Sequence, residues 1–334
     1  MTHNAYIHLE NDAVRVDVDR CERLRVPLHH LGSIVCFGNI MISPALMHRC
    51  AEDGMGLVLL DGHGRFKARL EGPVSGNILL RIAQHQRAGE EVFRLDVARA
   101  VVAGKIKNSR QILLRGAREA KDGLDAEKLS AGADLLASSV RQLPQAAHWE
   151  QVMGIEGQAA RCYFASLSCL LRGELRATFA MTERTRRPPR DRMNALLSFH
   201  YSMLMNDVRS ALDAVGLDPQ LGFFHAVRPG RASLALDLME ELRAYCVDRA
   251  VITLLNLGQV RPDDFDEHTG GAVLLNERGR RAVVAAYQER KQEEVTHPLL
   301  KTRVRIGLLP ILQARLLARA IRGETEGYIP FLVR

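Results

Sequence analysis

The stretch Gly72-Pro-Val-Ser-Gly76 divides the sequence into two parts with different hydrophobic periods. Before it, apolar and polar residues alternate, as in Ala13-Val-Arg-Val-Asp-Val18, which is typical of half-buried strands. After it, apolar residues recur at helical spacing almost to the end of the sequence. The sequence therefore predicts an α+β fold, with a small N-terminal β-sheet domain (residues 1–80) followed by a large α-helical domain (residues 81–334).

Shorter signals predict the individual elements. Ser33-Ile-Val-Cys-Phe37 and Gly56-Leu-Val-Leu-Leu60 are apolar runs typical of buried strands, and Asp61-Gly-His-Gly64 predicts a hairpin turn. Ser43-Pro44 predicts the start of one short helix in the β domain. The helices predicted for the second part are Asn77–Arg87, Glu90–Val102, Ser109–Lys121, Asp125–Gln142, Trp149–Leu171, Arg192–Val215, Ser233–Leu255, Glu277–Lys291 and Thr302–Arg322.

Composition narrows the class of protein. The 334 residues are 47% hydrophobic, which is enough for a sizeable core and excludes a disordered tail, a collagen or a disulfide-stapled mini-domain. The formal charge is +7, and only seven of the 46 basic residues are lysines. Arginine binds phosphate bidentately, so its excess favours a nucleic-acid partner. Codon bias from a GC-rich genome would explain the same excess.

The cysteines and the N-terminal residues indicate the compartment. None of the six cysteines forms a Cys-x-x-Cys pair, and most stand in apolar runs, which is typical of reduced core residues. The charged N-terminal stretch does not resemble a secretory signal, and no apolar run approaches the roughly 18 residues of a membrane span. We therefore expect a soluble, cytoplasmic protein without a membrane partner.

A first chemical candidate is Glu156, which stands within an apolar stripe of the helix predicted from Trp149. A carboxylate in such a stripe needs a cation or a proton to replace its hydration. Gly154 and Gly157 flank it and weaken the helix, which suggests that another group approaches closely there. The alternative is a salt bridge between Glu156 and one of the many arginines.

A second candidate group follows Gly222-Phe-Phe-His225, where the next helix carries Asp237, Glu240 and Glu241 on one face. Acidic residues early in a helix usually face water, and a lone histidine after two phenylalanines is usually a core residue. Together with Glu156, however, they form a mixed nitrogen and oxygen ligand set that suits Mg²⁺ or Mn²⁺. The phosphate-loop, zinc-protease and serine-hydrolase motifs are absent from the sequence.

With these residues the sequence resembles the CRISPR-associated integrase, the metal-dependent DNA endonuclease of spacer acquisition, in the branch found with type I systems. The resemblance covers nearly the whole chain. Its most specific parts are Gly154-Ile-Glu-Gly-Gln-Ala-Ala-Arg161, Asn194-Ala-Leu-Leu-Ser198 with Tyr201, Gly222-Phe-Phe-His225, Pro229-Gly-Arg231, and Ser233-Leu-Ala-Leu-Asp237 with Glu240.

The resemblance implies a reaction and the residues that perform it. Glu156, His225 and Glu240 match the family's metal ligands, although many relatives carry Asp where Glu240 stands, and Asp237 matches a second acidic position that could bind the metal through water. The implied reaction is attack by the 3′-hydroxyl of a DNA fragment on a phosphodiester at a repeat end, with Mg²⁺ or Mn²⁺. The implied partners are double-stranded and branched DNA, a second copy of the chain bound through the β domain, and a small ferredoxin-like CRISPR-associated adaptation subunit.

Arginine clusters are expected to bind the DNA backbone. One lies between two motif-bearing helices, one flanks His225, and one belongs to a basic C-terminal segment that has seven basic residues from Lys301 onward against two glutamates. The alternative for that segment is a solvated helix face. The predicted DNA-binding residues are Arg184, Arg186, Arg187, Arg190, Arg228, Arg231, Arg315, Arg319 and Arg322.

Two other functions remain open on the sequence alone. A non-catalytic nucleic-acid scaffold, with Glu156 in a salt bridge, would bind DNA without metal dependence. A metal-dependent phosphodiesterase acting on small substrates would not need the basic C-terminal segment.

Overall fold

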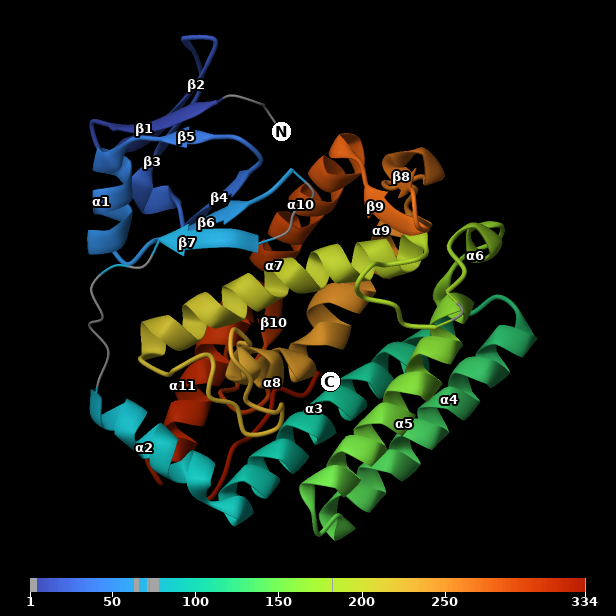
Figure 1. Ribbon diagram of the computed structural model, residues 1–334. Helices are drawn as coiled ribbons and strands as arrows, with labels where there is room; N and C mark the ends of the chain where they lie inside the picture. The colour runs from blue at the N-terminus through green and yellow to red at the C-terminus, as the bar shows by residue number, and fades with distance from the viewer. Residues whose placement is uncertain (1–4, 63–65, 71, 73–77, 182, 334) are drawn as a thin grey trace. The chain divides into compact units, whose positions relative to one another are not determined.

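The protein is described by a computed structural model, in which residues 5–62, 66–70, 72, 78–181 and 183–333 are placed. The chain forms two compact units, Met1–Ser75 and Gly76–Arg334. The first contains a β-sheet region and the second is mostly helical, which confirms the predicted α+β fold class (Figure 1).

The N-terminal unit contains two small sheets and one helix. The four-stranded sheet has the order β3-β2-β1-β5, and the three-stranded sheet has the order β4-β6-β7. The elements are β1 (Tyr6–Glu10), β2 (Ala13–Val18), β3 (Cys21–Pro27), a 3₁₀ turn (Leu28–His30), β4 (Ser33–Phe37), β5 (Met41–Ile42), α1 (Pro44–Glu52), β6 (Gly56–Leu60) and β7 (Phe66–Leu70).

Local sequence explains these elements. Val14 and Val18 are buried on one face of β2, as the alternating pattern predicts. Helix α1 begins where Ser43 caps it, because the Ser43 hydroxyl accepts a hydrogen bond from the Leu46 amide at 3.2 Å. Strands β6 and β7 pair antiparallel, as expected of a hairpin, although residues 63–65 of the predicted turn lie outside the described residues.

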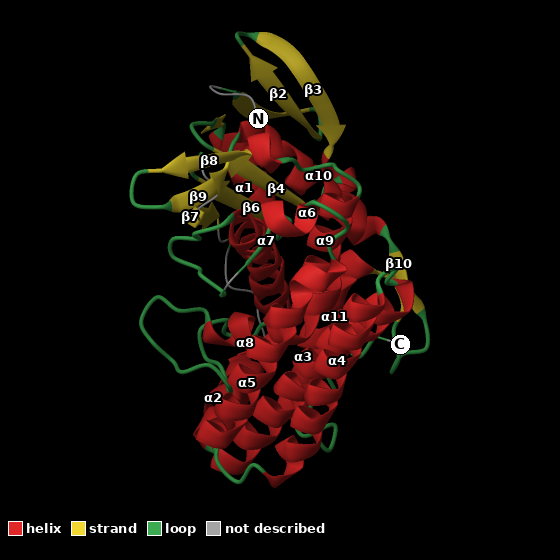
Figure 2. Cartoon of the chain, turned by 90° about the vertical axis from the view of Figure 1, so that its right-hand side faces the viewer, coloured by secondary structure: helices red, strands yellow, loops and turns green. Residues whose placement is uncertain are grey.

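The second unit is built of helices, with two short strand pairs added (Figure 2). Its helices are α2 (Ile78–Gly89), α3 (Glu91–Glu119), α4 (Gly123–Gln142), α5 (Trp149–Leu167), α6 (Leu175–Thr178), α7 (Arg192–Val215), α8 (Ser233–Leu242), α9 (Arg249–Asn256), α10 (Glu277–Gln292) and α11 (Leu309–Ile321). Its strands are β8 (Phe265–His268), β9 (Ala272–Leu275), β10 (Glu294–Thr296) and β11 (Arg303–Arg305). Its 3₁₀ turns are Leu143–Gln145, Ser168–Leu170, Pro262–Asp264 and Ile306–Leu308, and Arg243–Asp248 form a π-helix.

The structure corrects the predicted helices at three places. The two helices predicted between Glu90 and Lys121 are one continuous helix, α3. The helix predicted over Ser233–Leu255 contains a π-helical segment between α8 and α9. The helix predicted from Thr302 begins only at α11, because β11 pairs with β10 before it. The β8–β9 hairpin was also missed, although the glycine pair at its turn was a usable signal.

Gly104 lies in the middle of α3 because of close packing, and it does not break the helix. A Cβ at this position would lie 2.8 Å from Pro330 Cβ and 3.0 Å from Glu241 Cβ. Only glycine therefore lets α3 approach both α8 and the segment after α11 so closely. Helices α3, α4 and α5 pack together, and the segment after α11 returns to α3 and α8 (Figure 1).

Residues 328–333, the C-terminal strap, join α3 to α8 through buried hydrogen bonds. The side-chain amide of Asn108 on α3 donates to the carbonyl oxygens of Glu241, at 2.7 Å, and Phe331, at 2.8 Å. In return, the Val333 amide donates to Asn108 Oδ1 at 2.9 Å. The Glu241 carboxylate accepts from the Tyr328 hydroxyl at 2.6 Å and from the Phe331 amide at 2.9 Å. The strap therefore fixes the separation of the two helices.

The structure also bears on the cysteines and on membrane-spanning helices. All six cysteines are free, and three of them are buried. Within the described ranges, every helix is too short or too polar to cross a membrane.

Candidate metal centre

Three predicted ligands from separate segments come together in the helical unit, where Glu240 contacts His225 and shares a lysine with Glu156. Glu156 comes from α5, Glu240 from α8, and His225 from the loop before α8. Lys105, from the middle of α3, forms ion pairs with Glu156 Oε1 and with Glu240 Oε2, the latter at 2.7 Å. The Glu240 side chain is only 4% exposed, so this carboxylate depends on protein groups for its stabilisation.

The loop that carries His225 is held by α5 and α8. Asp237, near the start of α8, accepts hydrogen bonds from the amides of Phe223 at 2.6 Å, Phe224 at 2.9 Å and His225 at 2.7 Å. The Trp149 indole, at the start of α5, donates to the Phe224 carbonyl at 2.6 Å. The backbone of the loop is thus fixed on both sides.

Asp237 also orients the imidazole of His225. The Nδ1 atom lies 2.8 Å from Asp237 Oδ1, and because a carboxylate only accepts hydrogen bonds, Nδ1 carries the proton. The other ring nitrogen, Nε2, lies 3.8 Å from Glu240 Oε1. Histidines that bind metals are commonly held in this way, with one nitrogen donating to a carboxylate and the other available to the ion.

Both oxygens of Asp237 are used in these hydrogen bonds, and its side chain is 1% exposed. Asp237 was named as a residue that could bind a metal through water, and its contacts give it a direct role in holding His225. Glu241, on the same helical face in the prediction, points elsewhere and binds the C-terminal strap. Adjacent residues of a helix differ in direction by about 100°, which explains this separation.

Cations control the protonation of the centre. Burial alone would raise the pKa of Glu240, but Arg243, Lys105 and His225 outweigh it and lower that pKa to about 2. Burial likewise opposes the charge of Lys105, yet Glu240 and Glu156 raise the pKa of its ammonium. Arg243 Nη2 lies 3.1 Å from Glu240 Oε1. Glu240 is therefore ionised across the physiological range, as a metal ligand must be.

The donor atoms fit a hard divalent cation. Two carboxylates and one oriented imidazole form the mixed oxygen and nitrogen set that suits Mg²⁺ or Mn²⁺. Among the side chains that the structure describes, no three His, Cys, Asp or Glu residues already stand close enough together to enclose an ion. Here the Lys105 ammonium lies between Glu156 and Glu240 and supplies the positive charge.

Lys105 and Arg243 are the members of the centre that sequence reasoning missed. Glu156 was predicted to bind either a metal or an arginine, and the partner found is a lysine from α3. The sequence shows only that Lys105 is one of seven lysines and follows Gly104, which does not assign it to the centre. At the glycines beside Glu156 no other part of the described protein approaches closely, because a Cβ at Gly154 or Gly157 would meet no atom within 4 Å outside the local helix backbone.

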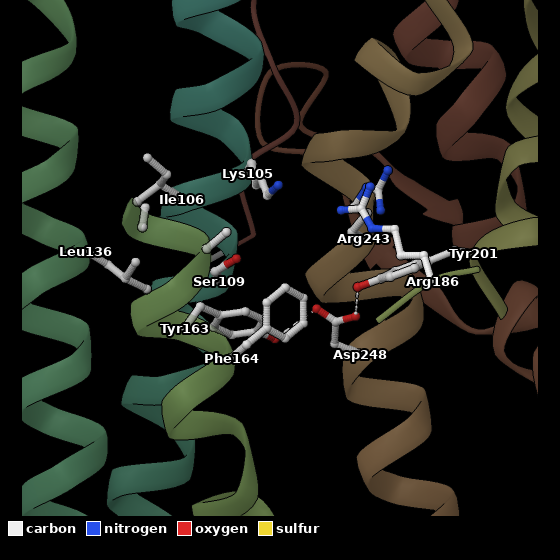
Figure 3. A pocket seen from close by; sticks show the side chains of 12 residues that line it. Lys105, Ile106, Ser109, Leu136, Tyr163, Phe164, Arg186, Tyr201, Arg243 and Asp248 are labelled. Carbon is white, nitrogen blue, oxygen red and sulfur yellow. Dashed lines mark hydrogen bonds between the residues drawn. The ribbon is translucent and has the colours of Figure 1, made fainter. Parts of the chain in front are cut away.

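A small cavity of about 30 Å³ adjoins the centre and is lined by Lys105, Arg186, Arg243 and Asp248, among others (Figure 3). Asp248 accepts hydrogen bonds from the Tyr163 hydroxyl at 2.9 Å and from the Tyr201 hydroxyl at 2.5 Å. Burial raises the pKa of Asp248 to about 6, and these hydrogen bonds only partly oppose the shift. The lining thus combines three cations with one buried carboxyl group.

The π-helix explains how Arg243 and Asp248 come to face the same cavity. Residues five apart diverge in an α-helix but lie nearly one above the other in a π-helix. The Arg243 guanidinium stands 4.7 Å from the centre of the Tyr201 ring, whose hydroxyl binds Asp248 (Figure 3).

The predicted DNA-binding arginines fall into three groups. Arg184 is engaged inside the protein, since it donates to Asn194 Oδ1 at 2.7 Å and to Ser198 Oγ at 3.1 Å, and burial lowers its pKa to about 10. Arg319 and Arg322 pair with Glu324 at 3.2 Å and 2.5 Å. The remaining members are exposed or half-buried: Arg186, Arg187, Arg190, Arg228, Arg231 and Arg315.

A profile of the family described as CRISPR associated protein Cas1 matches residues 1–289. CRISPR-associated endonuclease Cas1 1 of Moorella thermoacetica is 51% identical over 334 residues, which cover 100% of this chain and 97% of that protein. A Cas1 protein from Thermotoga maritima has a similar fold, with a TM-score of 0.82 at 22% identity over 98% of this chain and 97% of that one. A chain of a partial Cas6-RT-Cas1–Cas2 complex is also similar, with a TM-score of 0.68 at 25% identity over 100% of this chain and 96% of that one. This chain belongs to the Cas1 family of CRISPR-associated proteins.

Proposed function

We propose that this chain is a metal-dependent DNA endonuclease and integrase, which inserts short DNA fragments into a CRISPR array. The observation that carries the proposal is the geometry of His225. Its Nδ1 donates to Asp237 at 2.8 Å, while its Nε2 faces Glu240, and Glu156 reaches the same lysine as Glu240. The Moorella relative is named an endonuclease, which supports the same class of reaction.

The residues have distinct roles in this reaction, in which the 3′-hydroxyl of a fragment attacks a phosphodiester at a repeat end. Glu156, His225 and Glu240 would hold Mg²⁺ or Mn²⁺, and Asp237 keeps the imidazole in the tautomer that can bind it. The ion supplies polarisation of the scissile phosphate and a lower pKa for the attacking hydroxyl. No side chain needs to act as a nucleophile, and water in place of the hydroxyl gives strand cleavage.

Two features support a duplex or branched DNA substrate. Arg186 is exposed and lines the cavity beside the centre, and Arg228, also exposed, stands three residues after His225. On the helix face at Gly154 and Gly157, an added Cβ would have no protein atom within 4 Å, which leaves room for a bulky substrate beside Glu156. A phosphodiesterase for small substrates would need neither feature.

The proposed assembly follows the family. We infer a homodimer that forms through the N-terminal β unit, because about eighty residues bury little surface alone and the edge strands need cover. The similar chain in a partial Cas6-RT-Cas1–Cas2 complex supports a second CRISPR-associated partner, which we propose to be the small ferredoxin-like adaptation subunit. We expect the protein to act in the cytoplasm, where its DNA target lies.

One observation favours the non-catalytic scaffold, because the Glu156–Lys105 ion pair is the salt bridge that this alternative requires. Cleavage and strand-transfer assays on branched DNA, with Mn²⁺ or with EDTA, separate the two functions. Under the proposed function, Glu156→Gln, His225→Ala and Glu240→Gln each lower the rate by orders of magnitude, since the ion contributes several kcal/mol of transition-state stabilisation. Duplex binding should persist in all three variants.

The matched control is Glu150→Gln, which makes the same change at an exposed position of the same helix. It should retain the parental rate. Parental activity of Glu156→Gln with Mn²⁺ present would contradict the proposal, and DNA binding without any cleavage in the wild-type protein would favour the scaffold.

A further inference from the structure

Lys105 shares its ammonium between two carboxylates that the proposed function assigns to a metal ion. The ammonium forms ion pairs with Glu156 and with Glu240, and its side chain is only 14% exposed. We propose that Lys105 is an internal cation that neutralises the centre in the metal-free protein and withdraws when the divalent ion binds. This inference rests on the proposed function and deepens it.

The contacts imply competition between the lysine and the ion. Glu240 is buried and Glu156 is half-buried, and among the described residues only Lys105 forms ion pairs with both carboxylates, so in the metal-free protein it is the cation that they share. An ion bound by the same carboxylates would bring two or more positive charges within a few ångströms of the ammonium. The ammonium and the ion therefore exclude one another from this position.

The adjoining cavity gives the lysine somewhere to move. Lys105 already lines this cavity, opposite Arg243 and Arg186 (Figure 3). Asp248 is the carboxyl group in that lining, and two tyrosine hydroxyls already bind it. A third cation in this space therefore lacks a full protein counter-charge, and the phosphate of bound DNA would supply it.

Metal loading and phosphate binding should consequently strengthen each other. The ion releases the lysine, and the released lysine attracts the phosphate. Because coupling between two ligands is reciprocal, DNA must also raise the affinity for the ion by the same factor. Because of Lys105, the affinity of the centre for the divalent ion would be highest when DNA is bound.

The test measures Mn²⁺ binding by calorimetry on the full chain, in the wild type and in Lys105→Met, without DNA. Removing the competing cation should tighten Mn²⁺ binding at least tenfold, and Mn²⁺ should raise the melting temperature of the variant more than that of the wild type. Lys107→Met is the matched control, because Lys107 is an exposed residue of the same helix. It should bind Mn²⁺ as the wild type does, and Lys105→Arg, which keeps the charge, should also stay within a few-fold.

Lys105→Gln repeats the test with a polar side chain in case the methionine variant does not fold without metal. A duplex added to the wild type should tighten Mn²⁺ binding, and this gain should shrink in both neutral variants. The inference is overturned if Lys105→Met and Lys105→Gln fold but bind Mn²⁺ no more tightly than the wild type. In that case the proposed function still stands, provided that Mn²⁺ binding by the wild type depends on Glu156. Absence of Mn²⁺ binding in every protein overturns both.

Discussion

Replacing Asp237 by asparagine tests whether this residue sets the tautomer of His225. The carboxylate accepts four hydrogen bonds, three from consecutive backbone amides and one from the imidazole. If the side-chain nitrogen of the new asparagine points toward Phe223 and Phe224, it faces two backbone amides, which can only donate hydrogen bonds, as it does itself. If the nitrogen points toward His225 instead, it faces only one backbone amide. The imidazole can then accept a hydrogen bond at Nδ1, because its proton can move to Nε2. We therefore expect the second orientation in Asp237→Asn.

This orientation has two measurable consequences. The loss of one hydrogen bond to a charged acceptor, and the weakening of the others, should lower the free energy of unfolding by about 3 kcal/mol. For a unit of this size that corresponds to a melting temperature lower by about 6–12 °C. The proton on Nε2 now points toward Glu240 and blocks the nitrogen that would bind the ion, so Mn²⁺ affinity should fall about 10- to 100-fold.

Thermal melting in EDTA and calorimetry with Mn²⁺ measure the two effects separately. The control is Asp264→Asn, which changes another buried carboxylate that accepts a backbone hydrogen bond, from Arg261 at 2.8 Å, and pairs with Arg278. It should lower the melting temperature without changing Mn²⁺ affinity. If Asp237→Asn melts early but binds Mn²⁺ like the wild type, Asp237 is a structural residue only and the tautomer reasoning is refuted.

Three further predictions concern packing, pH and DNA. Gly104→Ala should lower the free energy of unfolding by about 1–3 kcal/mol, measured by urea denaturation, because the new Cβ would lie 2.8 Å from that of Pro330. Asp248 has a pKa of about 6 in the folded protein, above its usual value near 4, so the folded state holds an extra proton between about pH 4 and 6. The free energy of unfolding should therefore fall by about 3 kcal/mol as the pH rises through this window. Thermal melts across the window should show this fall in the wild type and not in Asp248→Asn. The double variant Arg315→Glu with Arg319→Glu should weaken binding to all duplex sequences alike, and titrations should show a smaller dependence of DNA affinity on salt concentration. An unchanged salt dependence would mean that these arginines only face solvent.

The sequence predicted most of the fold because its signals were local. The alternation in residues 13–18, the Ser43-Pro44 cap and the uninterrupted helical period of Arg192–Val215 each specify an element without help from distant residues. The failures lie where tertiary contacts decide. The predicted break between two helices includes Gly104, whose absent side chain admits Pro330 from the far end of the chain and leaves the helix continuous.

The candidate site was predictable in its residue types and less so in its arrangement. The sequence named Glu156, His225 and Glu240, and their mutual approach agrees with a common site, although their role as ligands stays a prediction. It could not name Lys105, because an ion pair between α3 and α8 depends on how the helices pack. It named Arg184 as a DNA contact, which stays a prediction, but it could not show the hydrogen bonds from Arg184 to Asn194 and Ser198, since charge patterns do not reveal internal contacts.

The C-terminal strap has a consequence for the time at which the centre forms during translation. Asn108 and Phe331 are separated by 223 positions, and their hydrogen bond helps to hold the helix of Lys105 against that of Glu240. A nascent chain whose residues 328–333 are still inside the ribosomal tunnel lacks these bonds, so α3 and α8 are held only by their direct packing and by the Lys105–Glu240 ion pair. Under the proposed function, the centre would therefore reach its final geometry, and with it the ability to cut the cell's own DNA, only after residues 328–333 had left the tunnel.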